Sequence, residues 1–156
     1  MVVGPMPSRP IILLAEDNED TRTVYSLILR HSGFRVEEAA TGIEAVEVAR
    51  QIRPNLILMD IGLPGIDGWQ ASRLLKSDPA TMAIPVLAFS ARVDSTADLC
   101  GRATFDGYIL KPISPLDLVR RVQAYMGLLG RRHAEPSEIR AIEPLEPADG
   151  QTELAV

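Results

Sequence analysis

The sequence has little of what several protein classes require. Its single cysteine, Cys100, has no partner for an internal disulfide, which favours a reducing, cytoplasmic setting. No apolar run approaches the roughly 20 residues that span a bilayer, and residues 1–9 do not have the layout of a signal peptide. A formal net charge of −5 disfavours nucleic acid and anionic lipid as partners. We therefore expect a cytoplasmic protein that binds neither membrane nor nucleic acid.

The chain does have enough apolar residues, 46% of 156, to fill the core of one domain. Residues 1–9 contain prolines and a glycine before any periodic pattern, and we predict a flexible lead-in. Residues 10–130 alternate between strand-like and helix-like patterns. Residues 131–156 are rich in Glu and Pro, and we predict a disordered acidic tail that is too short for an output domain.

Five strand-like runs alternate with five helix-like stretches. The predicted strands are residues 11–15, 34–39, 55–60, 84–90 and 106–111, and the predicted helices are residues 21–34, 42–54, 68–77, 95–103 and 114–129. This alternation predicts a parallel sheet with helices on both faces. The first, third and fourth runs are almost wholly apolar, as central strands are, whereas the second and fifth carry charge or alternate. We predict a flavodoxin-like (βα)5 doubly wound sheet with strand order 2-1-3-4-5.

Apolar residues at helical spacing predict which faces of two helices are buried. In the first helix they are Val24, Leu27 and Ile28, with His31 on the same face, and in the last helix they are Leu116, Val119, Val122 and Met126. Gly33 is the expected end of the first helix.

Acidic residues follow two strands that the predicted order makes neighbours. Glu16 and Asp17 follow the first strand, and Asp60 ends the third. Crowded carboxylates repel unless a cation joins them, and Mg²⁺ is the expected ion for oxygen ligands. Ser90 and Lys111 end the fourth and fifth strands at the same edge. The set predicts a site that receives a phosphoryl group, with Asp60 as the nucleophile.

Four segments in this order, "LLAEDNED", "LILMDIGLPGIDGW", "VLAFSAR" and "GYILKPI", resemble the CheY-like receiver domain of two-component response regulators over about residues 10–130. The resemblance implies a role for each matching residue. Asp60 is the expected phosphoacceptor; Glu16, Asp17, Asp60 and the Gly62 carbonyl are the expected Mg²⁺ ligands; Ser90 and Lys111 are expected to contact the phosphoryl group; Tyr108 is the expected aromatic switch; and the Lys111–Pro112 peptide bond is expected to be cis.

The resemblance implies a stand-alone signalling switch rather than an enzyme. Asp60 would take the phosphoryl group from a histidine kinase or a phosphotransfer protein. Ser90 would then move toward the phosphoryl group, Tyr108 would turn inward, and the face made by the fourth helix, fifth strand and fifth helix would change shape. This change would regulate a downstream protein that the sequence does not identify. We expect a monomer that dimerises through this face on phosphorylation.

Other readings of the same residues remain open. A pseudo-receiver would act as an interaction module without phosphorylation. An aspartyl-phosphate phosphatase of the haloacid-dehalogenase type would need a second aspartate at the position of Gly62. An FMN-binding flavodoxin would need a phosphate loop where this chain has the acidic "AEDNED". Asp60 could also be a plain strand-ending carboxylate, and Asp67 is expected to cap the third helix rather than bind metal.

Overall fold

The computed structural model describes residues 8–91 and 105–130, without the side chains of residues 128–130. The predicted helix at 95–103, the tail at 131–156 and residues 1–7 of the lead-in lie outside these ranges. The chain divides into two compact units between Pro115 and Leu116. The elements are β1 Ile11–Ala15, α1 Glu19–His31, β2 Arg35–Ala39, α2 Gly42–Ile52, β3 Leu56–Met59, α3 Gly68–Ser77, β4 Val86–Ser90, β5 Gly107–Leu110 and α5 Pro115–Gly130.

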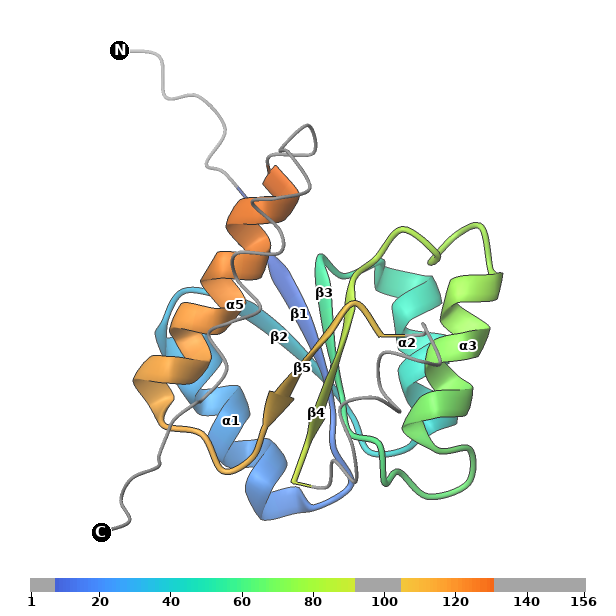
Figure 1. Cartoon of the computed structure of the whole chain (residues 1–156), viewed down its shortest axis with the longest axis horizontal. Helices are drawn as coiled ribbons and strands as arrows, with labels where there is room; N and C mark the ends of the chain where they lie inside the picture. The colour runs from blue at the N-terminus through green and yellow to red at the C-terminus, as the bar shows by residue number, and fades with distance from the viewer. Residues whose placement is uncertain (1–7, 92–104, 131–156) are drawn as a thin grey trace, which may run out of the picture. The chain divides into compact units, whose positions relative to one another are not determined.

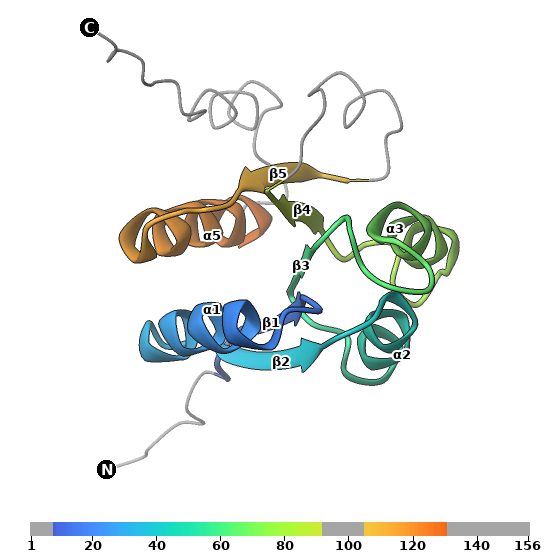
Figure 2. The same cartoon turned by 90° about the horizontal axis from the view of Figure 1, so that it is seen from below.

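The five strands form one parallel sheet with the order β2-β1-β3-β4-β5 (Figure 2). The register pairs Ala15 at the end of β1 with Ala39 on β2 and Met59 on β3. The strands therefore end at a common edge. Both the predicted flavodoxin-like fold class and the predicted strand order are confirmed.

Burial differs between the central and the outer strands as predicted. All residues of β3 and β4 are buried, and so are all but the first of β1. In β2 and β5 the side chains range from buried to exposed. Strands that are covered on both faces must be apolar throughout, and this is why continuous apolar runs mark the centre of the sheet.

Helices of the first unit cover both faces of this sheet. In Figures 1 and 2, α1 lies against one face, and α2 and α3 lie side by side against the other. The core between the sheet and the α2–α3 pair contains Leu13 and Ile57 from the strands, and Ala45, Ala49 and Leu75 from the helices. Within the described ranges, every helix is too short or too polar to span a lipid bilayer.

Polar side chains cap the three helices of this unit. Asn18 and Thr41 accept backbone N–H groups at the starts of α1 and α2. Asp67 and Gln70 form a reciprocal capping box at the start of α3. The prediction that Asp67 caps the third helix is therefore confirmed. Gly33 follows Ser32, the C-cap residue of α1, and has a φ of 99°, a conformation that glycine adopts without strain.

The predicted buried face of α1 is wrong. Val24 and Leu27 are 52% and 59% exposed, and His31 is also exposed. The helix instead buries the i,i+4 pair Tyr25 and Leu29, and the Tyr25 ring makes an edge contact with Phe89 at 4.9 Å between ring centroids. Two stripes of apolar residues run along α1, so spacing alone did not decide which one faces the sheet.

The predicted face of α5 is correct only in part. Val122 is fully buried, but its buried partner is Leu118 rather than Leu116, which is 58% exposed. Positions 116 and 118 are about 200° apart on a helix with 3.6 residues per turn, so both cannot be buried on one face.

We predict that Ser26→Ala stabilises the protein by about 1 kcal/mol. Ser26 is fully buried in α1, and its hydroxyl has no hydrogen-bond partner among the described residues. Alanine removes this buried polar group and has the higher helix propensity. Thr81→Val is the control, because the buried Thr81 hydroxyl donates to the Leu75 carbonyl at 2.7 Å. Urea unfolding should show opposite changes in the free energy of unfolding; a destabilised Ser26→Ala variant would refute the prediction.

Candidate functional site

The backbone of the sheet places the site residues at its carboxyl edge. Glu16 donates its N–H to the Ala39 carbonyl at 2.9 Å, and Asp60 donates to the Ala15 carbonyl at 3.0 Å. Lys111 donates to the Ser90 carbonyl at 3.1 Å. Each site residue thus continues the hydrogen-bond pattern of its strand by one position. This explains how residues far apart in sequence reach one place.

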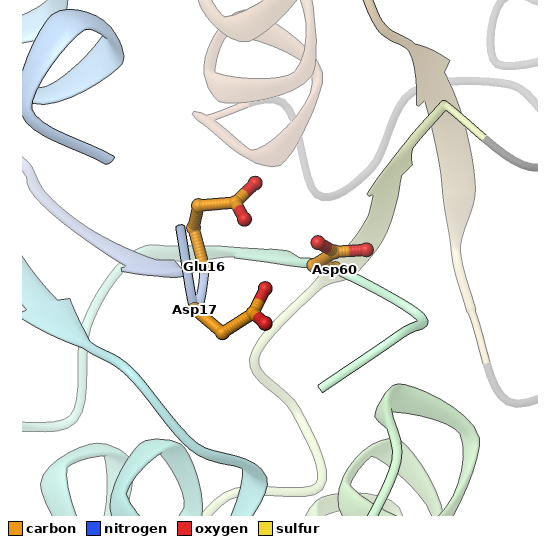
Figure 3. Close-up of side chains that lie close together, drawn as sticks. All are labelled: Glu16, Asp17 and Asp60. Carbon is orange, nitrogen blue, oxygen red and sulfur yellow. The ribbon is translucent and has the colours of Figure 1, made fainter. Parts of the chain in front are cut away.

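Three carboxylates converge there. Glu16 is buried, Asp17 is exposed and Asp60 is half-buried. One carboxylate oxygen from each residue lies within 4.8 Å of the others, and Figure 3 shows the three side chains directed toward a common space between the ends of β1 and β3. The prediction that these residues meet at one edge is confirmed.

A single ammonium group joins two of these carboxylates. The Lys111 side chain is 12% exposed, and its Nζ forms an ion pair with Glu16 Oε1. The same Nζ lies 3.4 Å from Asp60 Oδ2 and 5.2 Å from the centroid of the Phe89 ring. The Lys111 ammonium group therefore lies beside the carboxylate of Asp60, where it offsets part of the repulsion among the carboxylates.

Burial raises the pKa of Glu16. Removing the carboxylate from water disfavours its charged form, and the nearby Asp60 carboxylate acts in the same direction. The ion pair with Lys111 and a hydrogen bond from the Asn18 N–H, 3.1 Å from Glu16 Oε2, oppose this shift. Desolvation is the largest of these effects, so the net direction is upward.

We predict that the free energy of unfolding decreases less with rising pH in Glu16→Gln than in wild type. Because the folded protein has the higher Glu16 pKa, it binds more protons than the unfolded chain between the two pKa values, and its stability falls as the pH rises from 4.5 through the folded pKa. Glutamine does not titrate. Urea unfolding in EDTA from pH 4.5 to 8 should give a smaller decline for Glu16→Gln than for wild type, and parallel curves would contradict the prediction.

A second carboxyl group has a pKa shifted in the opposite direction, but it titrates below the pH range of this experiment. A hydrogen bond from the Ala80 N–H and the Arg50 guanidinium lower the pKa of Asp78. The ionised Asp78 therefore stabilises the folded protein, and this stabilisation is lost as the pH falls below the ordinary aspartate range. Because Glu16→Gln leaves Asp78 unchanged, the difference between the two curves isolates Glu16.

The loop after Asp60 is fixed by close backbone contacts. The Gly62 N–H donates to Asp60 Oδ1 at 3.1 Å, and the Gly68 N–H donates to the Ile61 carbonyl at 2.9 Å. A Cβ atom on Gly68 would lie 2.3 Å from the Asp60 carbonyl oxygen. This packing role of Gly68 was not predicted from the sequence. The Asp-Gly pair at positions 67–68 indicated a turn, but no sequence signal shows a close approach between helix and loop.

The remaining predicted residues lie on β4 and β5. Ser90 ends β4 and is buried, and Tyr108 is half-buried on β5. The Lys111–Pro112 peptide bond is cis, as the resemblance implied.

The donor set fits a hard divalent cation. Mg²⁺ takes oxygen ligands at 2.0–2.1 Å in octahedral geometry, so opposite ligands lie about 4.2 Å apart. One oxygen atom from each of the three carboxylates lies within 4.8 Å of the others, close enough for one ion to reach all three, and the exposed Asp17 leaves the cluster open to solvent. Glu16, Asp17 and Asp60 could therefore hold Mg²⁺.

Comparisons with known proteins agree with this geometry. The family described as the response regulator receiver domain matches residues 12–123. The polar-differentiation response regulator DivK of Brucella anthropi is 32% identical over 117 residues, which cover 74% of this chain and 95% of that protein. The DNA-binding response regulator MtrA of Mycobacterium tuberculosis is 32% identical over 139 residues, or 88% of this chain. The chain spans 58% of the length of MtrA.

Solved structures extend the likeness to the fold. The receiver domain of the sensor histidine kinase PA1611 from Pseudomonas aeruginosa has a TM-score of 0.71 and 35% identity, with 77% of this chain and 99% of that chain covered. That structure has a magnesium ion coordinated in its active site cleft. The chemotaxis protein CheY4 of Vibrio cholerae has a TM-score of 0.69 and 25% identity, with 74% and 98% covered.

The fold, the acidic cluster beside Lys111 and the family match over most of the chain support one assignment. The chain belongs to the receiver domain family of two-component response regulators, whose members are phosphoacceptor signalling switches.

Proposed function

We propose that Asp60 is the residue of this chain that accepts the phosphoryl group, and that residues 10–130 form the receiver domain. The observation that carries the proposal is the convergence of Asp60 with Glu16, Asp17 and Lys111 at the carboxyl edge of the sheet. Such a cluster supplies a carboxylate nucleophile, a place for a divalent cation and a fixed ammonium group, the parts that phosphoryl transfer requires.

A histidine kinase or a histidine phosphotransfer protein is the proposed donor. An Asp60 carboxylate oxygen attacks the phosphorus atom, and an O–P bond forms as the P–N bond of the donor phosphohistidine breaks. The electron pair of that bond leaves with the imidazole nitrogen. Lys111 Nζ, 3.4 Å from Asp60 Oδ2, is placed to offset negative charge on the phosphoryl oxygens.

Magnesium is the proposed cofactor. Glu16, Asp17 and Asp60 would hold it through side chains, and Gly62 through its backbone carbonyl. The bound ion would supply charge compensation for the transferred group. The chain itself orients Asp60: Oδ1 accepts from the Gly62 N–H at 3.1 Å, and Oδ2 faces Lys111.

Ser90 and Tyr108 are the proposed switch residues. Phosphorylation adds about −1.5 to −2 charges and new acceptor oxygens at Asp60. Ser90, at the end of the neighbouring strand, would move its hydroxyl toward these oxygens, and Tyr108 would turn into the space that is left. The result is a shift between two packings of the surface around β5, read by a partner protein. Dimerisation on phosphorylation stays a prediction, testable by size-exclusion chromatography.

Two alternatives compete with this proposal. A pseudo-receiver would use the same fold for binding without phosphorylation, and the intact set of acidic residues with Lys111 disfavours it. An aspartyl-phosphate phosphatase would need an acid/base carboxylate two residues after the nucleophile, where this chain has Gly62.

The test follows the fluorescence of Trp69, the only tryptophan in the chain. Trp69 adjoins Gly68, which contacts the Asp60 backbone, and its ring packs on Phe105 at 5.0 Å between centroids. Beryllofluoride, a phosphoryl mimic, should change this fluorescence saturably in Mg²⁺ but not in EDTA. Asp60→Asn should abolish the change.

Mass spectrometry after acetyl phosphate treatment gives a second readout. Wild type should gain one phosphoryl group, and Asp60→Asn should gain none. A wild type that responds in neither assay would overturn the proposal in favour of the pseudo-receiver. Equal phosphorylation of Asp60→Asn would place the acceptor elsewhere.

A further inference from the structure

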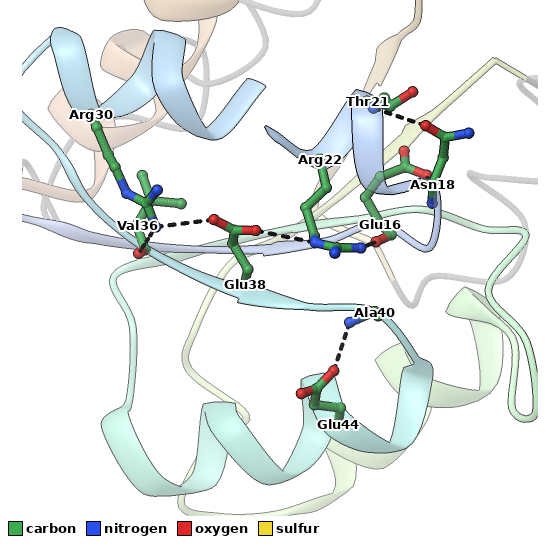
Figure 4. Close-up of polar contacts among 9 residues, drawn as sticks. All are labelled: Glu16, Asn18, Thr21, Arg22, Arg30, Val36, Glu38, Ala40 and Glu44. Atoms are coloured by element: carbon green, nitrogen blue, oxygen red, sulfur yellow. Dashed lines mark hydrogen bonds and ion pairs between the residues drawn. The ribbon is translucent and has the colours of Figure 1, made fainter. Parts of the chain in front are cut away.

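An arginine on α1 forms a hydrogen bond with the backbone between the two acidic residues that follow β1. Arg22 Nη1 donates to the Glu16 carbonyl oxygen at 2.8 Å, and Arg22 Nε donates to Glu38 Oε1 on β2 at 3.1 Å (Figure 4). The Arg22 side chain is only 17% exposed. The guanidinium therefore joins the loop that carries Glu16 and Asp17 to the neighbouring strand.

A second arginine holds Glu38 from its other side. Arg30 Nη2 donates to Glu38 Oε2 at 3.1 Å and to the Val36 carbonyl at 3.0 Å. Both oxygens of Glu38 are thus occupied, one by each arginine, as Figure 4 shows. We refer to Arg22, Glu38 and Arg30 as the arginine clamp. Arg22 is its only member that reaches the acidic loop in these contacts.

The carbonyl that Arg22 holds belongs to the peptide unit that joins Glu16 to Asp17. Because a peptide unit is planar, fixing its oxygen fixes the direction in which Asp17 starts. The Glu16 N–H is fixed as well, by the Ala39 carbonyl at 2.9 Å. Repulsion among the carboxylates favours a movement of the Glu16–Asp17 backbone away from Asp60. The two hydrogen bonds to the Glu16 backbone oppose this movement.

We propose that Arg22 is a positioning residue for the magnesium site, oriented for this task by Glu38 and Arg30. The proposal rests on the proposed function, since it requires Glu16 and Asp17 to bind Mg²⁺. Arg22 acts through the backbone of Glu16 and contacts none of the three carboxylates in the hydrogen bonds and ion pairs described here. Its positive charge by itself opposes cation binding, so charge and position predict opposite effects when Arg22 is removed.

Mg²⁺ titration by isothermal calorimetry on the full chain separates these effects. Arg22→Gln should weaken Mg²⁺ binding about tenfold, the low end for losing an outer-shell partner of a metal ligand. A purely electrostatic role predicts tighter binding. Arg22→Lys keeps the charge and loses the two-pronged geometry, so it should also weaken binding.

A double variant removes the charge effect. Arg22→Gln with Glu38→Gln leaves the net charge unchanged, so weaker Mg²⁺ binding by this variant reports position alone. The matched control is Arg50→Gln with Asp78→Asn, which deletes another arginine–carboxylate pair, 2.8 Å long, at the C-terminal ends of α2 and α3. Those helix ends lie at the opposite edge of the sheet, and the control should keep the wild-type Mg²⁺ affinity.

Each outcome decides the proposal. Wild-type or tighter Mg²⁺ binding by Arg22→Gln and by the double variant would overturn it while leaving the proposed function intact. A wild type that does not bind Mg²⁺ would overturn both. If circular dichroism shows that Arg22→Gln is unfolded, Arg22→Lys decides: wild-type Mg²⁺ affinity in this variant would overturn the proposal. Equal weakening by the control pair would mean a general loss of stability, and the positioning role would be rejected.

Discussion

Lys111→Met is expected to slow phosphorylation by acetyl phosphate about 100-fold, the effect of losing one fixed donor to a developing charge. Lys111 Nζ is 3.4 Å from Asp60 Oδ2 and pairs with Glu16 Oε1. Methionine keeps an apolar side chain of similar length beside the Phe89 ring but removes the charge. The rate is measured by mass spectrometry at fixed Mg²⁺ and acetyl phosphate concentrations.

The same substitution should leave Mg²⁺ binding intact or make it tighter. An ammonium among the carboxylates repels a divalent cation, so its removal favours the ion. The prediction therefore separates two steps: phosphoryl transfer is slowed while cation binding is kept. Loss of both together would indicate that the acidic cluster had collapsed.

The chain offers a matched control in Lys76, its only other lysine. Lys76 Nζ also forms an ion pair, with Asp106 Oδ2 at 2.7 Å, and donates to the Ile84 carbonyl at 2.8 Å. Lys76→Met should lower the free energy of unfolding but leave the phosphorylation rate unchanged. Equal slowing by both variants would refute the specific role of Lys111.

Much of the fold could be predicted from the sequence because a parallel strand that is buried on both faces has a continuous run of apolar residues. The continuous apolar runs of β1, β3 and β4 could only lie in the middle of a sheet, and the charged β2 and the partly exposed β5 only at its edges. The strand order then brought Glu16, Asp17, Asp60 and Lys111 to one edge, since parallel strands end together. The site was thus predictable from topology before any side-chain contact was known.

Contacts between helices and their neighbours were not predictable in the same way. The prediction of the buried face of α1 was wrong because two sets of apolar residues have helical spacing, Val24–Leu27–Ile28 and Tyr25–Leu29. Only the packing of Tyr25 against Phe89 distinguishes the buried set. The arginine clamp was missed for a related reason. Charged residues on a helix and an edge strand are usually solvated, and nothing in the spacing of Arg22 and Glu38 indicates that their side chains meet.

Gly68→Ala is expected to destabilise the protein by about 3 kcal/mol, at the upper end for overpacking, and to disturb the backbone at Asp60 directly. The new Cβ atom would lie 2.3 Å from the Asp60 carbonyl oxygen and 2.8 Å from the Ile61 Cα. Both are backbone atoms, so no side-chain rotation relieves the contact. Relief of this clash requires α3 to move away or the Asp60 loop to shift. The hydrogen bond from the Gly68 N–H to the Ile61 carbonyl, 2.9 Å long, opposes the separation of α3 from this loop.

Two other glycines are controls for this prediction. A Cβ atom on Gly127 of α5 would have no neighbouring atom of the described residues within 4 Å, so Gly127→Ala should stabilise by about 0.5–1 kcal/mol through helix propensity. Gly42→Ala would place a Cβ 2.3 Å from the Ile66 carbonyl oxygen, on the same loop but away from Asp60. It should therefore destabilise comparably while affecting phosphorylation less. Urea unfolding and acetyl phosphate labelling below the unfolding transition give both quantities; if Gly68→Ala and Gly42→Ala reduce labelling equally, Gly68 fixes the loop as a whole rather than Asp60 in particular.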